Sequence, residues 1–214
     1  VFSNIVTSLS TFFLSEELDL LFSAPVGVEN IYRAKFIETL VDSSWMTLIY
    51  GLPVFIAYGV VFKASLLYYL GLLLTIVPFL IIPAAIGIIV TMLLVNAFPA
   101  RRAKDVIVLL GLLFFVVIYI LFRMLQPEKL VDPDAFPSLV QYLTAMRAPV
   151  SPLLPSSWAT ETLSPLLRKT GGEALFYLLM LWSTGLAGIV IGEWLCLRIY
   201  YAGWSKSREG KKAA

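Results

Sequence analysis

Acidic side chains within apolar segments are the residues of this sequence that could do chemistry. Glu38 and Asp42 are spaced i, i+4 near the start of one apolar segment, and Glu193 lies in another. The i, i+4 spacing puts two side chains on one face of a helix, and ionisable groups in a membrane segment are candidates for binding a proton or a cation. These three residues are therefore a candidate intramembrane polar site. Two alternatives stay open, because Glu38 and Asp42 are close enough to a helix start to contact water, and Glu193 could pair with Arg198 or a neighbouring helix.

Other kinds of catalytic and metal chemistry find little support in the sequence. It contains no histidine and one cysteine, Cys196, so His-ligated and thiolate metal sites are not expected. Ser43 and Ser44 beside Asp42 could be imagined as the nucleophile and base of an intramembrane enzyme. Activation of serine is difficult without a histidine or a lysine within the apolar segments. We therefore predict no catalytic residues, no metal and no cofactor in this chain.

The elements that position these residues are expected to be membrane helices. Hydrophobic residues make up 59% of the chain and charged residues 14%, against about 25% charged residues in a typical soluble domain. Several uncharged runs exceed about 18 residues, the length that indicates a membrane span. The sequence predicts an all-α, polytopic helical membrane protein with a single transmembrane domain over 1–200. Its expected parts are the end of a truncated helix at 1–14, a cytoplasmic segment at 15–30, complete spans at 36–62, 66–98, 106–125 and 174–197, an outer loop with short interfacial helices at 126–172, and a basic cytoplasmic tail at 201–214.

Prolines and glycines indicate how the spans bend and pack. Pro78 and Pro83 lie within the 66–98 span and could mark a hinge or a plain packing kink. Gly188 and Gly192 form a small-xxx-small pair, which suits close packing of two helices. The expected orientation has the C-terminus in the cytoplasm, because ten of the sixteen Lys and Arg residues then lie on the inner side. This predicts a multi-pass protein of the cell membrane, plasma or inner.

The 15–30 segment is a charged insert between two apolar runs. Ser15 can cap a helix, and acidic residues in the first turn are favoured by the helix dipole. A short apolar stripe follows at i, i+3 and i+4, and Pro25 and Gly27 end the helix. The acidic residues are Glu16, Glu17 and Asp19, and the stripe is Leu18, Leu21 and Phe22. The segment is predicted either to contact a partner or to lie on lipid headgroups. Three acidic residues would suit an anionic membrane surface poorly.

The order of features resembles ABC exporter permeases of the second type. The resemblance rests on the acidic residues, Leu-Leu-Phe and Ser-Ala-Pro-Val of the insert, on Lys35 opening the next helix, and on Ser151-Pro152-Leu153-Leu154-Pro155 in the outer loop. It implies a C-terminal fragment that begins in the second transmembrane helix. It also implies that Glu16, Glu17, Leu18, Asp19, Leu21 and Phe22 couple the chain to a separate ABC ATPase subunit, which would carry ATP and Mg.

By this resemblance the chain would form the translocation path of an ATP-driven exporter. It would pair with an identical or a sister permease, contact membrane lipid and bind no nucleic acid. The pattern G-x-x-x-x-G-K-[ST] that cradles phosphates does not occur, which indicates a transport subunit rather than an enzyme. The alternative is an ion-coupled secondary carrier or a membrane scaffold that uses Glu38, Asp42 and Glu193.

Overall fold

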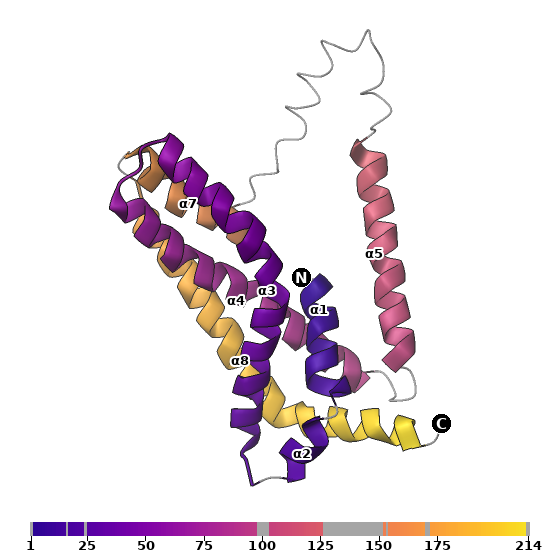
Figure 1. Cartoon of the computed structure of the whole chain (residues 1–214). Helices are drawn as coiled ribbons and strands as arrows, with labels where there is room; N and C mark the ends of the chain where they lie inside the picture. The colour runs from indigo at the N-terminus through magenta and orange to yellow at the C-terminus, as the bar shows by residue number, and fades with distance from the viewer. Residues whose placement is uncertain are drawn as a thin grey trace. The chain divides into compact units, whose positions relative to one another are not determined.

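The computed structural model describes residues 2–15, 17–23, 25–97, 103–125, 152, 154–169 and 172–212, which form helices joined by short turns (Figure 1). No strand occurs in these ranges. The elements are α1 (Phe2–Leu9), the π-helix η1 (Ser10–Leu14), α2 (Glu17–Ser23), α3 (Val28–Val61), α4 (Leu66–Ala97), α5 (Ala103–Leu125), α7 (Pro155–Arg168) and α8 (Ala174–Lys212).

Three of these helices are long and apolar enough to cross a membrane, by length and composition. They are Val28–Val61, Leu66–Asn96 and Ala174–Ile199. The all-helical class and the presence of membrane-length helices are therefore confirmed, but the predicted count of four complete spans is not. The remaining predicted span, 106–125, falls in α5, where the apolar run among the described residues is Gly111–Ile120.

The chain divides into two compact units, and each is described by itself. The first contains Val1–Ala103 and Pro152–Ala214, and the second contains Lys104–Ser151. In the first unit α4 packs against α8, α1, α7 and α3. The predicted outer loop at 126–172 contains α7, and its 126–151 part lies outside the described residues.

A buried polar contact fixes α1 on α4. Ser8 Oγ and Thr91 Oγ1 are 2.5 Å apart, and Thr91 Oγ1 also lies 3.1 Å from the carbonyl oxygen of Ile5. A Cβ on Gly87 would lie 2.8 Å from Asn4 Cβ and 2.9 Å from the Asn4 backbone carbon. Because real Cβ atoms do not approach so closely, only glycine at position 87 allows α1 to lie this near α4.

The main core joins the N-terminal elements to α3, α4 and α8. Phe12 of η1, Tyr32 of α3 and Ile88 of α4 are buried in one cluster, together with Cys196 of α8. Tyr32 lies between two other rings, with centroid distances of 6.0 Å to Phe12 and 5.9 Å to Phe36. Aromatic pairs at such distances stabilise a core beyond the area they bury. This cluster places the first turns of α3, which carry the candidate site.

Candidate interaction site at α2 and the start of α3

The predicted coupling segment forms α2, which lies beside the start of α3 at the bottom of Figure 1. Leu18 is 0% exposed and packs in the main core cluster, and Leu21 packs against that cluster from its edge. Leu18 and Leu21 of the predicted apolar stripe therefore face this chain's own core. Leu20, in contrast, is 73% exposed. The side chains of Glu16, Asp19 and Phe22 lie outside the described part of the structure.

The exposed face of α2 differs from the face that the sequence singled out. Glu17, Leu20 and Ser23 are exposed and are spaced i, i+3, i+6 along the helix. The apolar residue available to a partner is thus Leu20, which the sequence-based prediction did not include. Leu20 does not fit the i, i+3 spacing that puts Leu18 and Leu21 on one face, and this was the signal that could have placed it on the outer face. The docking role of the segment itself stays a prediction.

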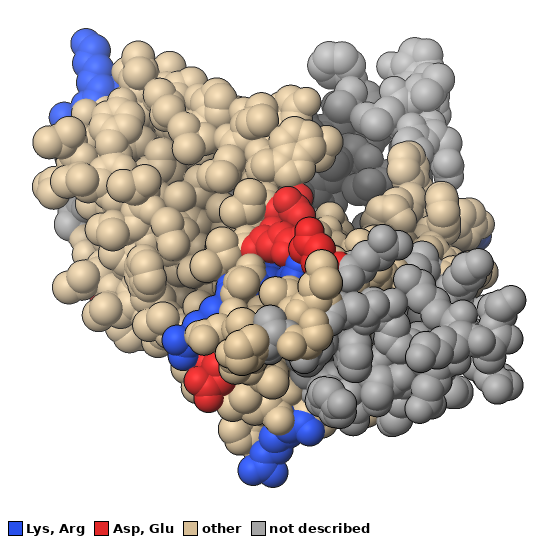
Figure 2. All heavy atoms as spheres, turned by 60° about the horizontal axis from the view of Figure 1, so that its bottom comes forward, with Lys and Arg blue, Asp and Glu red and all other residues tan. Residues whose placement is uncertain are grey.

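A buried lysine ties α2 to α3. The Lys35 side chain is 3% exposed, and its Nζ donates to Glu38 Oε2 at 2.8 Å and to Glu17 Oε2 at 3.3 Å. Burial of a charged group is costly unless it is paired, so the two carboxylates fix where this ammonium can lie. Figure 2 shows acidic side chains gathered next to basic ones on this face of the molecule. The prediction treated Lys35 only as the residue that opens a helix, although Glu38 at i+3 was a signal for the pair.

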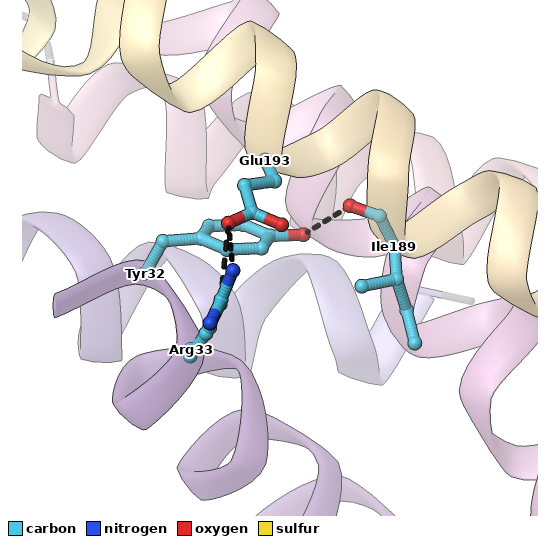
Figure 3. A network of polar contacts seen from close by, with 4 residues as sticks. All are labelled: Tyr32, Arg33, Ile189 and Glu193. Carbon is cyan, nitrogen blue, oxygen red and sulfur yellow. Dashed lines mark hydrogen bonds and ion pairs between the residues drawn. The ribbon is translucent and has the colours of Figure 1, made fainter. Parts of the chain in front are cut away.

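A second ion pair joins α3 to α8 (Figure 3). Arg33 donates from Nη2 at 2.9 Å and from Nε at 3.2 Å to Glu193 Oε1. Tyr32, the residue before Arg33, donates a hydrogen bond from its Oη to the carbonyl oxygen of Ile189 on α8 at 3.3 Å. The sequence left two partners open for Glu193, and the structure selects the neighbouring helix. Arg198 instead lies over the Trp194 ring, 4.6 Å from its centroid.

The candidate intramembrane polar site is not one site in this structure. Glu38 bonds to Lys35 and Glu193 bonds to Arg33, while Asp42 is exposed on α3. Across the described ranges no group of three or more His, Cys, Asp or Glu side chains lies together in a way that could hold a metal ion. Glu193 therefore joins α8 to α3 through Arg33, whereas Glu38 pairs with Lys35 within α3.

The glycines and prolines that the sequence singled out lie on packed faces. A Cβ on Gly188 would lie 2.9 Å from Ala85 Cβ, and one on Gly192 would overlap the Tyr32 hydroxyl. α8 therefore approaches α4 and α3 closely at these two positions. α4 is one helix from Leu66 to Ala97 with Pro78 and Pro83 inside it, and Pro78 is fully buried. A hinge at these prolines stays a prediction.

Comparison with known proteins places the chain in a family. A family model described as "putative ATP-binding cassette" matches residues 1–214. The chain belongs to this ATP-binding cassette family. No curated protein and no solved structure matches it. Membership of an ABC-type family implies association with other ABC components.

This match corrects several predictions. The family is described as an ATP-binding cassette and not as a permease of the second type, so the predicted permease, exporter and translocation path are wrong. The alternative of a secondary carrier or scaffold falls with them, and so do the terms that describe the chain as a permease. The prediction of a transport subunit without its own nucleotide-binding motif is also contradicted, because the family is described as an ATP-binding cassette. The phosphate-cradling pattern G-x-x-x-x-G-K-[ST] does not occur in the sequence, so that pattern identifies no nucleotide-binding residue here.

Proposed function

We propose that the chain is a membrane-embedded component of an ATP-binding cassette assembly and that the exposed face of α2 contacts another component of that assembly. The observation that carries the proposal is the double attachment of α2. Leu18 buries it against the core, and Glu17 bonds to the buried ammonium of Lys35 at the start of α3. A contact made on Glu17, Leu20 and Ser23 would therefore act on a helix of membrane length.

The partner we propose is another component of the assembly, one that carries ATP and Mg. Leu20, an exposed apolar side chain beside the acidic Glu17, suits a cleft in a partner that has apolar residues at its base and basic residues at its edge. An anionic membrane surface suits this face less well, because Glu17 is 73% exposed there at its side chain and would be repelled. Pairing with a second copy or a sister subunit is the other contact we propose, and the mass of the purified complex measures it.

Leu20→Asp tests the docking contact with little risk to the fold, because Leu20 is exposed. We expect the variant chain, purified from its own membranes, to lose copurifying ATPase activity by about tenfold or more, as for a lost anchor of about 1.4 kcal/mol or more. Leu154→Asp is the matched control. Leu154 is an exposed leucine at the N-cap of α7, where aspartate is a preferred residue. Equal ATPase recovery with both variants would refute the docking role.

The membrane location is the second half of the proposal. It is supported by the three apolar helices, and we propose α5 as a fourth crossing, with the C-terminus on the cytoplasmic side. Alkaline carbonate extraction should leave the chain in the membrane pellet, and a C-terminal reporter should read out on the cytoplasmic side. Release into the supernatant would exclude the embedded location, whatever the outcome of the Leu20→Asp experiment.

A further inference from the structure

A cavity lies between α3, α4 and α7, in the half of α3 that is remote from α2. Its volume is about 420 Å³, within the range of about 300–1,000 Å³ that is typical of small-molecule sites. Its walls are mostly apolar and include Phe55 and Tyr58 of α3, Leu72 and Phe79 of α4, and Leu163 of α7. Figure 1 shows α7 lying beside α3 and α4 at this end of the first unit.

The cavity is long and narrow because it follows the helices. α7 runs antiparallel to α4, since Leu166 lies against Gly71 whereas Trp158 packs with Ile82. On α4 the lining extends from Tyr68 to Phe79, which is about 17 Å at 1.5 Å per residue. About 420 Å³ spread over this length suits one extended hydrocarbon chain better than a bulky ring system.

One buried hydroxyl in the cavity wall has no partner among the described residues. Thr75 is 2% exposed, lines the cavity, and its Oγ1 makes no hydrogen bond within the described part of the chain. Other helical threonines bond back one turn: Thr91 Oγ1 donates to the Gly87 carbonyl oxygen and Thr162 Oγ1 to the Trp158 carbonyl oxygen, each at 2.8 Å. A buried polar group left without a partner is costly, so an acceptor from a bound molecule would stabilise Thr75.

A positively charged side chain lies at one end of the same cavity. It belongs to Arg168, the last residue of α7, which lines the cavity and is exposed. It makes no ion pair with a carboxylate of the described residues. Leu166 of α7 lies beside Gly71 of α4. Because the two helices are antiparallel, Arg168 lies near the level of residue 69 on α4, which is about 9 Å from Thr75 along the α4 axis. The arginine side chain and a glycerol backbone together span such a distance.

We propose that this cavity binds one acyl chain of an anionic glycerophospholipid from the membrane. The phosphate lies against the Arg168 guanidinium, the ester carbonyl accepts a hydrogen bond from Thr75 Oγ1, and the chain extends past Leu72 and Phe79. Charge complementarity and the unpartnered hydroxyl select this occupant over a plain hydrocarbon or a detergent tail. The site rests on the proposed membrane location of the chain but is separate from the α2 contact, so the Leu20→Asp experiment and the lipid experiments can fail independently.

Native mass spectrometry of the full chain released from detergent micelles tests the Thr75 contact. The probes are palmitoyl lysophosphatidylglycerol and its alkyl-ether analogue, which lacks the carbonyl. We expect Thr75→Val to weaken binding of the acyl probe about three- to tenfold and to leave the ether analogue unchanged, as one hydrogen bond would. Thr75→Ser should keep the acyl preference. Thr39→Val is the matched control, because Thr39 Oγ1 is also buried without a partner in the described residues but does not line the cavity. Equal binding of the two probes by the unaltered chain would overturn the proposal.

The head group and the cavity itself are tested with the same readout. Arg168→Gln should weaken binding of the anionic probe about two- to fivefold. Lys169→Gln should leave binding unchanged, because Lys169 is the adjacent exposed basic residue and does not line the cavity. Gly51→Leu should abolish binding of both probes, because Gly51 lines the cavity and has open space beside it, whereas Gly111→Leu in α5 should have no effect. Equal effects within either pair of variants would show binding elsewhere on the apolar surface and would overturn the site.

Discussion

The ion pair between Arg33 and Glu193 should hold α8 against α3, and its loss should be measurable. The Glu193 Oε1 atom accepts two hydrogen bonds from Arg33, and the Arg33 side chain is 62% exposed. Because solvent screens an exposed pair, its contribution is at the upper end of the surface range, about 0.5–1 kcal/mol, with the forked geometry in its favour. Arg33→Gln and Glu193→Gln each remove the charge and keep most of the side-chain volume.

The natural cysteine supplies the assay. Cys196 is the one cysteine of the sequence, is 1% exposed, and lies in the same core cluster as Tyr32. A maleimide reaches its thiol when α8 opens locally from this cluster, so the labelling rate follows the population of the open state. A loss of about 0.5–1 kcal/mol corresponds to labelling that is about two- to fivefold faster in either variant. The measurement uses the purified full chain in detergent at constant pH.

A double-mutant cycle decides whether the pair itself is responsible. The double variant should label about as fast as either single variant, because the second substitution removes an interaction already lost. Arg198→Gln is the control, since Arg198 lies two residues from Cys196 but stacks on Trp194 of its own helix. Rates in the double variant that equal the product of the two single effects would refute the reasoning. So would an equal acceleration in Arg198→Gln.

Three further predictions concern packing, and thermal unfolding in detergent measures them. Leu18→Ala should lower stability by about 2–5 kcal/mol, whereas Leu20→Ala should stay within about 0.5 kcal/mol, because the first residue is buried and the second exposed; equal effects would refute the inward orientation of the stripe. Glu38→Gln should cost more, about 1–3 kcal/mol, than Lys35→Met, since the first leaves a buried ammonium short of a partner and the second leaves exposed carboxylates; the reverse order would contradict this. Gly87→Ala should cost about 1–3 kcal/mol, because its Cβ would press on the α1 backbone; an unchanged midpoint would show that α1 is not held this close.

The helices could be predicted from the sequence where an uncharged run defined them. The 66–98 prediction matches α4 at Leu66–Ala97, since both ends of that run are marked by charge or a turn. α3 begins at Val28, whereas the predicted membrane span begins at 36, because the helix continues through charged residues such as Arg33 and Lys35. In the structure those early turns are held by tertiary contacts: Tyr32 is in the core and Lys35 is paired. Contacts between distant segments are not encoded in local hydropathy.

The candidate site could be predicted only as a segment. Periodicity shows that α2 has an apolar face, but it does not say whether a partner or the chain's own core covers that face. Leu18 shares a core cluster with Phe12 and Tyr32, which come together with it only on folding. Burial of Lys35 was equally hidden, because a lysine at a helix start is ordinarily exposed. The family was misassigned because the resemblance rested on topology and a few short motifs, and the match over 1–214 decided against the permease.

The first turns of α3 join three elements within four residues. Tyr32 and Arg33 bond to α8, and Lys35 bonds to Glu17 of α2. A displacement of α2 would therefore act on α3 and α8 together, through bonds of 2.9–3.3 Å rather than through a flexible loop. The other half of α3 forms a wall of the cavity beside α4 and α7. If both proposals hold, one helix connects the contact with another ABC component to the contact with a lipid. Coupling between them then requires that lipid occupancy change Leu20-dependent partner binding, and the Gly51→Leu variant with its filled cavity measures that change directly.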